Sequence, residues 1–107
     1  MNSLPNREIL DAIKARLRDT YGTRLRGVVL FGSQARGDAT PQSDIDVLVL
    51  LDGPVDPGRD LDTNLRALYP LALQWSRRVS AKPIAADEYE NLDCPLYREA
   101  RREGIAA

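Results

Sequence analysis

The stretch GSQARGDATPQSDID, from Gly32 to Asp46, decides the fold of this chain because it separates two apolar runs. The run RGVVLF ends at Phe31, and the run IDVLVLL begins at Ile45. Both runs are rich in β-branched and large apolar residues and are bounded by turn-forming residues, so both are predicted to be buried strands. The stretch between them is therefore predicted to be a polar connection that leads from one strand into the next.

Two carboxylates stand at the end of this stretch. Asp44 and Asp46 are two residues apart, and side chains on a strand alternate between the two faces of a sheet. If the second strand begins by Ser43 or Asp44, both carboxylates project from one face, roughly 6–7 Å apart along the strand. Mg²⁺ binds carboxylate oxygens and keeps open positions for substrate phosphates. The pair indicates a divalent-cation site, although solvated residues at a strand end give the same pattern.

The first half of the stretch has the features of an anion site. Gly32 and Ser33 follow directly on a strand, where glycine permits a sharp turn and close approach of a ligand. A short helix from Ser33 through Arg36 would direct free backbone N–H groups at a phosphate, and the Arg36 guanidinium suits the same ligand. Gly37 is expected to end that helix. Ser43, at the other end of the loop, either orients the Asp44 carboxylate or stabilises the turn.

Composition limits the classes of function. The 107 residues are expected to form a single domain, residues 1–107, with a modest core. The net charge of −1 argues against a nucleic-acid surface, and no apolar run is long enough to span a bilayer. The chain has no histidine, and its one cysteine, Cys94, cannot form an internal disulfide. We therefore expect a cytoplasmic protein that contacts neither membrane nor nucleic acid directly.

The flanking elements follow from periodicity. Apolar residues at helical spacing predict an amphipathic helix from Pro5 to Tyr21. A strand is expected between Thr23 and Phe31, and a third one between Val79 and Ala86, where Pro83 favours the edge of a sheet. Two shorter helical segments are expected at residues 87–91 and 96–103.

A longer helix is predicted to start near Arg59 or Asp60. Pro70 lies inside this helix, so we expect a kink or a restart there, before Trp75. The expected apolar stripe of the helix consists of Leu61, Leu65, Leu68 and Ala72. The order of elements fits an α/β (α+β) fold, in which a small mixed sheet is packed with helices on one face.

The composite pattern G-S-x-A-R-G-D-x-x-x-x-S-D-I-D, read from Gly32 to Asp46, resembles the signature of the polymerase-beta-type nucleotidyltransferase superfamily. In this fuller form it is similar to the minimal nucleotidyltransferase (MNT) family of small prokaryotic proteins. Many members are encoded beside an all-helical HEPN partner and act as its antitoxin. The resemblance is most specific from Leu30 to Leu51, and it extends more loosely over the whole chain, including the segment from Pro95 to Gly104.

The resemblance implies the nucleotidyltransferase fold, with the site on the exposed face of the sheet. It implies a Mg²⁺-dependent antitoxin that transfers a nucleoside monophosphate, AMP from ATP, to a hydroxyl of a HEPN-type toxin. Asp44 and Asp46 would be catalytic and would hold one or two Mg²⁺ ions. The residues implied to bind the nucleotide and its phosphates are Gly32, Ser33, Arg36 and Ser43.

The third strand departs from the superfamily pattern. The superfamily usually adds a third carboxylate from a later strand, but the polar residues between Val79 and Ala86 are Ser80 and Lys82. A second hypothesis is therefore kept: a catalytically weak or inactive antitoxin of the same fold, which neutralises its partner by binding. A third reading is a nucleotidyltransferase for small molecules of the antibiotic-modifying kind, which usually needs a second domain or a dimer.

Overall fold

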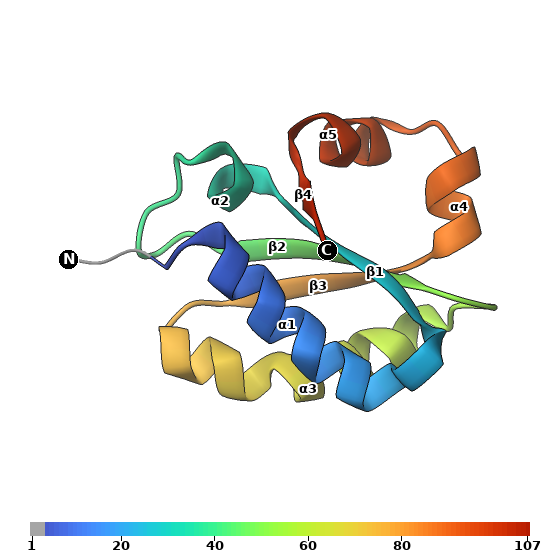
Figure 1. The fold of residues 1–107 in the computed structure, drawn as a ribbon, viewed down its shortest axis with the longest axis horizontal. Helices are drawn as coiled ribbons and strands as arrows, with labels where there is room; N and C mark the ends of the chain where they lie inside the picture. The colour runs from blue at the N-terminus through green and yellow to red at the C-terminus, as the bar shows by residue number, and fades with distance from the viewer. Residues whose placement is uncertain (1–3) are drawn as a thin grey trace.

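The computed structural model describes residues 4–107 (Figure 1). A 3₁₀ turn at Gly22–Arg24 joins the first helix to the first strand. The helices are α1 (Asn6–Tyr21), α2 (Gly32–Arg36), α3 (Pro57–Trp75), α4 (Ala86–Asn91) and α5 (Pro95–Glu103), and the strands are β1 (Leu25–Phe31), β2 (Ile45–Leu51), β3 (Val79–Ala85) and β4 (Ile105–Ala106).

The four strands form one sheet in the order β3-β2-β1-β4. β1 pairs with β2 and with β4 in antiparallel fashion, whereas β2 and β3 are parallel. The sheet is therefore mixed, as expected. The strand order places β3 at an edge, which confirms the prediction. Pro83 suits this position, because it cannot donate a hydrogen bond to a further strand.

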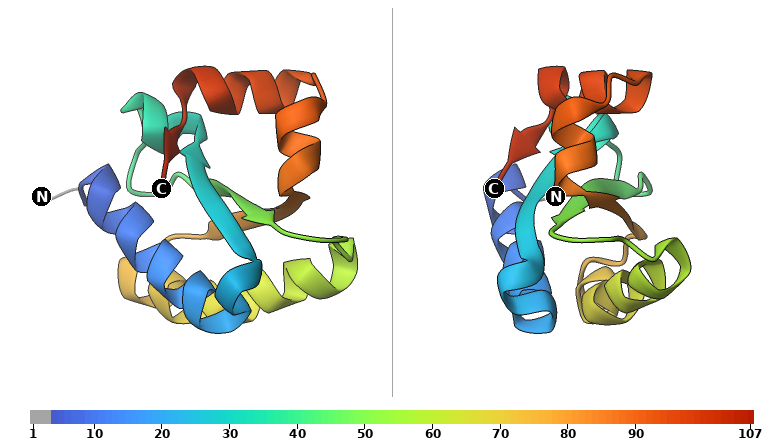
Figure 2. Two further views of the ribbon diagram at one scale, coloured as in Figure 1. Left: turned by 45° about the vertical axis from the view of Figure 1, so that its right-hand side comes forward. Right: turned by 90° about the vertical axis from the view of Figure 1, so that its right-hand side faces the viewer.

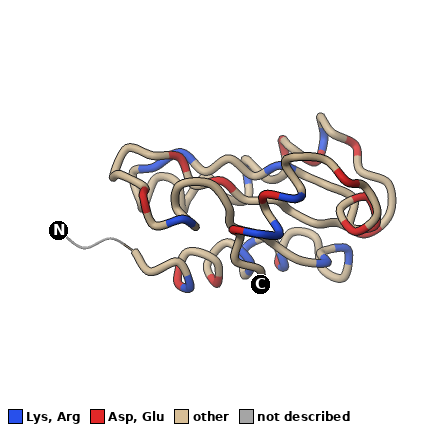
Figure 3. The backbone as a smooth tube through the Cα atoms, turned by 90° about the horizontal axis from the view of Figure 1, so that it is seen from above, with Lys and Arg blue, Asp and Glu red and all other residues tan. Residues whose placement is uncertain are grey.

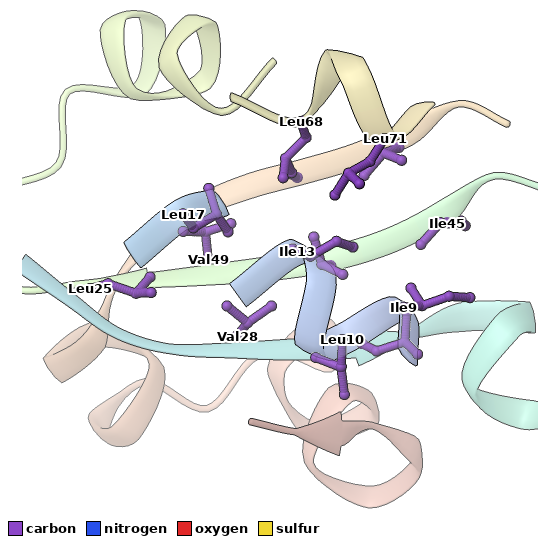
Figure 4. Packing of buried hydrophobic residues seen from close by; sticks show 14 of the residues in the cluster. Ile9, Leu10, Ile13, Leu17, Leu25, Val28, Ile45, Val49, Leu68 and Leu71 are labelled. Carbon is purple, nitrogen blue, oxygen red and sulfur yellow. The ribbon is translucent and has the colours of Figure 1, made fainter. Parts of the chain in front are cut away.

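The main core lies between the sheet and two helices that cover one of its faces (Figures 1 and 2). Along β2, alternate residues from Ile45 to Leu51 point towards this core. The predicted apolar face of α1 packs against them and is fully buried, as Figure 4 shows for its four residues: Ile9, Leu10, Ile13 and Leu17. The apolar residues of α1, which recur every 3.6 positions, and those of β2, which recur every two, are thus buried in the same core.

The opposite face of the sheet carries a second, smaller core at one end. Tyr97 and Ala100 of α5 are buried there with Val29 and Leu48. The Tyr97 hydroxyl donates to the Glu88 carboxylate of α4 at 2.6 Å, which links the two C-terminal helices. The expected helices on one face are α1 and α3, while α4 and α5 cover only part of the other face (Figure 2).

Helix α3 differs from its prediction in three respects. It begins earlier, at Pro57, where the Asp56 side chain caps it by accepting from the Arg59 N–H at 3.1 Å. It also continues through Pro70 to Trp75, so the expected restart is wrong. The apolar stripe was wrong in part, because the N-terminal half of α3 buries polar side chains. Leu61 and Leu65 are exposed, and the buried residues are Asp60, Asn64, Leu68 and Leu71.

Hydrogen bonds explain why Asp60 is buried in place of a leucine. The Arg24 guanidinium donates to both Asp60 carboxylate oxygens, at 3.0 and 2.9 Å, and the Asp56 N–H donates at 3.0 Å. The hydrogen bonds from Arg24, the largest effect, hold the pKa of Asp60 below its ordinary value. From apolar periodicity alone, Asp60 is treated as a polar residue, and its side chain is therefore predicted to be exposed.

Asp60→Asn is expected to lower the free energy of unfolding by about 2 kcal/mol at pH 7, since it leaves a partly buried guanidinium without its counter-charge. Because the folded pKa of Asp60 is depressed, the stabilisation is present above the ordinary aspartate pKa and is lost as the pH falls through the folded value. Urea unfolding at several pH values measures this effect. Asp62→Asn, an exposed change on the same helix, is the control, and an equal loss there would contradict the prediction.

Within residues 4–107, no helix is both long and apolar enough to cross a membrane.

Candidate active site

The two aspartates lie on either side of Ile45, the first residue of β2, so the strand begins one residue later than the start at Asp44 that would place both carboxylates on it. Asp46 is the second residue of this strand and lies between Phe31 of β1 and Ser80 of β3 in the register of the sheet. Its neighbours on β2 point into the main core, so Asp46 faces the opposite side of the sheet. Asp44 is exposed and immediately precedes the strand.

The loop from Gly32 is in direct contact with Asp46. Gly32 has a φ of +75°, which side chains rarely allow, and a Cβ added to it would lie 2.8 Å from Asp46 Oδ2. The backbone of the first residue of α2 therefore packs against the carboxylate. This contact brings together the two ends of the stretch from Gly32 to Asp46.

The electrostatic environment of Asp46 disfavours its charge. Burial raises the pKa of Asp46, and the charge of Asp44 raises it further. Because the charge of Asp44 disfavours the charge of Asp46, the two acids repel in the absence of a counter-charge. A divalent cation between them would remove this repulsion, so the donor set fits a hard metal ion.

Helix α2 spans Gly32–Arg36, one residue more than the predicted Ser33 to Arg36, and it ends as expected at Gly37, whose φ is +85°. Its first N–H groups have no partner within the helix and begin beside Asp46. The buried Gln34 side chain donates to Asn6 Oδ1 of α1 at 2.8 Å and so anchors α2 to α1. The short helix is therefore held in place by a side chain from the first residue of α1, 28 positions away in the sequence.

Arg36 is partly exposed and has acidic neighbours. Its Nε atom lies 3.4 Å from Asp38 Oδ2, and its Nη1 atom lies 3.7 Å from Glu103 Oε2 at the end of α5. The loop from Gly32 to Asp46 contains three acids and one base, whereas the two signs are mixed along the rest of the chain (Figure 3). This excess of negative charge would repel a triphosphate unless a cation were bound with it.

The turn before Asp44 is closed by hydrogen bonds between Thr40 and Ser43. The Thr40 N–H donates to Ser43 Oγ at 2.9 Å, the Thr40 hydroxyl lies 3.1 Å from the same atom, and the Ser43 N–H donates to the Thr40 carbonyl. The Ser43 hydroxyl is thus engaged within the turn. Of the two readings of Ser43, this arrangement favours stabilisation of the turn.

In the part of the chain that the structure describes, no third acid joins the pair. Ser80 of β3 stands beside Asp46 in the parallel register, and Lys82 follows two residues later on the same face. Among residues 4–107, no group of three or more histidine, cysteine, aspartate or glutamate side chains is arranged to hold a metal ion. A cation at this site would have to complete its coordination with nucleotide oxygens and water.

Several residues around the site have no signal in the local sequence. Asn6 contacts the loop from α1, Glu103 contacts it from α5, and Arg77 contacts it from the segment after α3. Each makes a contact across a long sequence separation, which neither periodicity nor a short motif reports. The one available hint is that polar side chains recur on otherwise half-buried elements.

Fold and site together define a class of protein: an α/β domain in which two carboxylates stand at a strand start, one of them against a glycine-serine turn that opens a short helix. The family model for the nucleotidyltransferase domain matches residues 8–103. The chain therefore belongs to the nucleotidyltransferase domain family, and its resemblance to the minimal nucleotidyltransferases is confirmed.

Two curated relatives come from Methanocaldococcus jannaschii. The chain is 39% identical over 67 residues to "Putative protein adenylyltransferase MJ0604", a match that covers 63% of each chain. It is 46% identical over 46 residues to "Putative protein adenylyltransferase MJ1379", covering 43% of this chain and 44% of the relative. The matches thus span less than two thirds of the length of these relatives.

Solved structures share the fold. A crystal structure of a toxin-antitoxin with AMP-PNP contains a chain with a TM-score of 0.66 and 23% identity, covering 90% of this chain and 69% of that one. A "putative minimal nucleotidyltransferase" has a TM-score of 0.55 and 28% identity, covering 92% and 89%. Spectinomycin adenyltransferase AAD(9) from Enterococcus faecialis, solved with ATP and spectinomycin, has a TM-score of 0.62 and 22% identity, covering 85% of this chain but 38% of that enzyme.

Proposed function

We propose that this protein is an antitoxin that transfers a nucleoside monophosphate, AMP from ATP, to a hydroxyl of a HEPN-type toxin in the cytoplasm. Membership of the nucleotidyltransferase family supports the reaction class. The names of the curated relatives support a protein as acceptor and AMP as the transferred group. The structural neighbours from toxin-antitoxin complexes support the partner class.

The observation that carries the proposal is the contact between Gly32 and Asp46. A carboxylate packed against the backbone of a glycine-serine turn allows one ligand to touch both. The ligand that suits both is a triphosphate with its metal ion, because phosphate oxygens accept hydrogen bonds from N–H groups and also bind Mg²⁺. The excess of acids in the loop supports the same reading, since the nucleotide would bind only with its cation.

The residues have the following proposed roles. Asp44 and Asp46 would hold one or two Mg²⁺ ions, which would stabilise negative charge on the reacting phosphates. The N–H groups of Gly32 and Ser33 and the guanidinium of Arg36 would hold the triphosphate in line with the acceptor. Ser43 would keep the turn that presents Asp44. The acceptor oxygen bonds to the α-phosphorus, the bond to pyrophosphate breaks, and the hydroxyl proton is released.

Arg36 must change partners for this role. In the structure its guanidinium is near the carboxylates of Asp38 and Glu103. Both contacts are longer than 3.2 Å and therefore weak, so phosphate oxygens can replace them. Water screens the exposed contact with Asp38, whereas Glu103 Oε2 is buried. Before the nucleotide arrives, the two acids would hold the Arg36 guanidinium beside the loop.

A second candidate function rests on Ser80. Because Ser80 stands beside Asp46 where an acid would complete a metal site, the protein could bind its partner and neutralise it without transferring a nucleotide. In that case the nucleotide site would be vestigial or regulatory. The two candidates differ in whether neutralisation needs Asp44 and Asp46.

Mass spectrometry of the co-expressed toxin decides between them. The experiment compares the toxin produced with the unmodified protein, with Asp44→Ala and with Asp46→Ala. We expect the toxin mass to increase by one nucleoside monophosphate only with the unmodified protein. The size of the increase identifies the nucleotide, and fragmentation identifies the acceptor residue.

The opposite outcome is equally clear. If the double variant Asp44→Ala/Asp46→Ala neutralises the toxin fully and the toxin mass never changes, the proposed transfer is wrong and the binding function stands. A toxin that is modified equally by all variants would show that the two aspartates are not the metal ligands.

A further inference from the structure

The segment between α3 and β3 forms hydrogen bonds with the backbone on both sides of Asp44. The Arg77 Nε atom donates a hydrogen bond to the carbonyl oxygen of Ser43 at 2.9 Å. The backbone N–H of Ile45 donates to the carbonyl oxygen of Arg78, also at 2.9 Å. The residues before and after Asp44 are therefore tied to two consecutive residues that lie more than thirty positions away in the sequence.

Nothing else in the described chain directs the Asp44 side chain. Its carboxylate is exposed, and no side-chain hydrogen bond or ion pair involves it among residues 4–107. The direction of this carboxylate thus depends on the backbone that carries it. That backbone ends the loop from Gly32 and has the Arg77 contact as its one side-chain support on the β3 side.

The segment that contains Arg77 is itself held in an uncommon conformation. Ser76 has a φ of +53°, and among residues 4–107 it is the one non-glycine residue with positive φ. The Arg77 N–H donates to the carbonyl oxygen of Ala72 at 3.1 Å, which ends α3. This turn reverses the chain so that the Arg77 side chain can reach Ser43 and the Arg78 carbonyl can pair with β2.

The Arg77 side chain is also poorly suited to a purely structural role. Its Nη2 atom is buried and has no hydrogen-bond partner within the described residues. A buried donor without an acceptor destabilises a fold, and an apolar side chain of similar length would avoid this cost. Unusual backbone conformations and unsatisfied groups of this kind are concentrated at functional sites.

We propose that Arg77 is a positioning residue: through the carbonyl of Ser43 it fixes the backbone of Asp44 and so aims the Asp44 carboxylate at a cation shared with Asp46. The inference rests on the proposed function, because it takes Asp44 as a metal ligand. It extends that function to a residue outside the motif, at the junction of α3 and β3. Arg77 touches neither nucleotide nor metal in this role.

The test is the affinity for Mn²⁺ in the presence of a non-hydrolysable ATP analogue, measured by electron paramagnetic resonance of free Mn²⁺. Arg77→Met keeps the aliphatic stem and removes the donor, and it is expected to raise the Kd for Mn²⁺ about tenfold, as for the loss of one charge-assisted hydrogen bond. Arg77→Lys retains a charged donor and is expected to stay within about threefold of the parent. The melting temperature is recorded for each variant.

Arg66→Met is the matched control, because it removes the same charge from an exposed position on α3. It is expected to leave Mn²⁺ binding unchanged. If Arg77→Met does not fold, Arg77→Gln, which keeps a shorter neutral donor, carries the same expectation of weaker binding. A merely structural role would lower the melting temperature of the Arg77 variants without separating Met from Lys in Mn²⁺ affinity.

Three results would overturn the inference. If Arg77→Met binds Mn²⁺ as tightly as the parent, Arg77 does not position Asp44, while the proposed function stands. If Arg66→Met weakens binding equally, the effect is one of net charge alone. If the parent and Asp44→Ala bind Mn²⁺ equally, Asp44 is not a ligand, and the proposed function fails together with the inference.

Discussion

Asp46→Asn is expected to lower the rate of nucleotidyl transfer by about 10²–10³-fold, while the folded protein becomes no less stable. The loss of rate follows from removing one of two carboxylates that would hold the cation on the reacting phosphates. Asparagine keeps the size of the side chain and its place against Gly32. The variant therefore tests the charge at this position, not the shape.

The stability of the same variant follows from the raised pKa of Asp46. Burial, and to a lesser degree the charge of Asp44, disfavours the ionised carboxylate in the folded protein. The contribution of this group to stability is full below the ordinary aspartate pKa of about 4 and is lost as the pH rises through the raised folded value. At pH 7 the neutral asparagine avoids that loss, and the difference from the parent should disappear in acid.

Two measurements check this prediction: pyrophosphate release in the presence of the toxin, and urea unfolding at pH 7 and below pH 4. Asp52→Asn changes the same charge at the other end of β2, where the side chain is exposed, and it should leave the rate of transfer unchanged. A variant that transfers nucleotide at the parental rate, or one that unfolds more easily than the parent at pH 7, would show that the account of Asp46 is wrong.

The second large effect is expected at Gly32. Gly32→Ala places a methyl group 2.8 Å from Asp46 Oδ2, at a backbone φ that costs an L-residue about 1–2 kcal/mol. The carboxylate has to move, and a displacement of about 1 Å in a positioned group can reduce the rate about 10²-fold. We therefore expect Gly32→Ala to lose both stability and most of its transfer activity.

Gly37→Ala separates these two effects. Gly37 has a similar φ of +85°, but a Cβ added there meets nothing within 4 Å. The control should show a comparable loss of stability in urea unfolding and a much smaller loss of transfer activity. Equal activity losses in both variants would mean that backbone strain, and not the contact with Asp46, controls the site.

Much of the fold can be predicted from local patterns. The apolar spacing of α1, the apolar run of β2 and the proline in β3 each correspond to the element observed, because each pattern reflects which face is buried. Helix α2 and the glycine at its end are also predictable, since positive φ at Gly32 and Gly37 requires the residue found there.

The remaining features depend on contacts between distant parts of the chain. The burial of Asp60 becomes favourable only when Arg24 donates to it from 36 residues away. Strand β4 has two residues and exists only because β1 offers a partner. Arg77 approaches Ser43 through a turn at Ser76 whose left-handed conformation no residue pattern reports. Local periodicity contains no information about these pairings.

Pro83 in the border strand β3 bears on how the protein can meet other proteins. A backbone without an N–H at this position cannot donate a hydrogen bond to an additional strand, so the β3 edge resists the edge-to-edge pairing that leads to fibres. Recognition of another protein at this edge must then use side chains and helices.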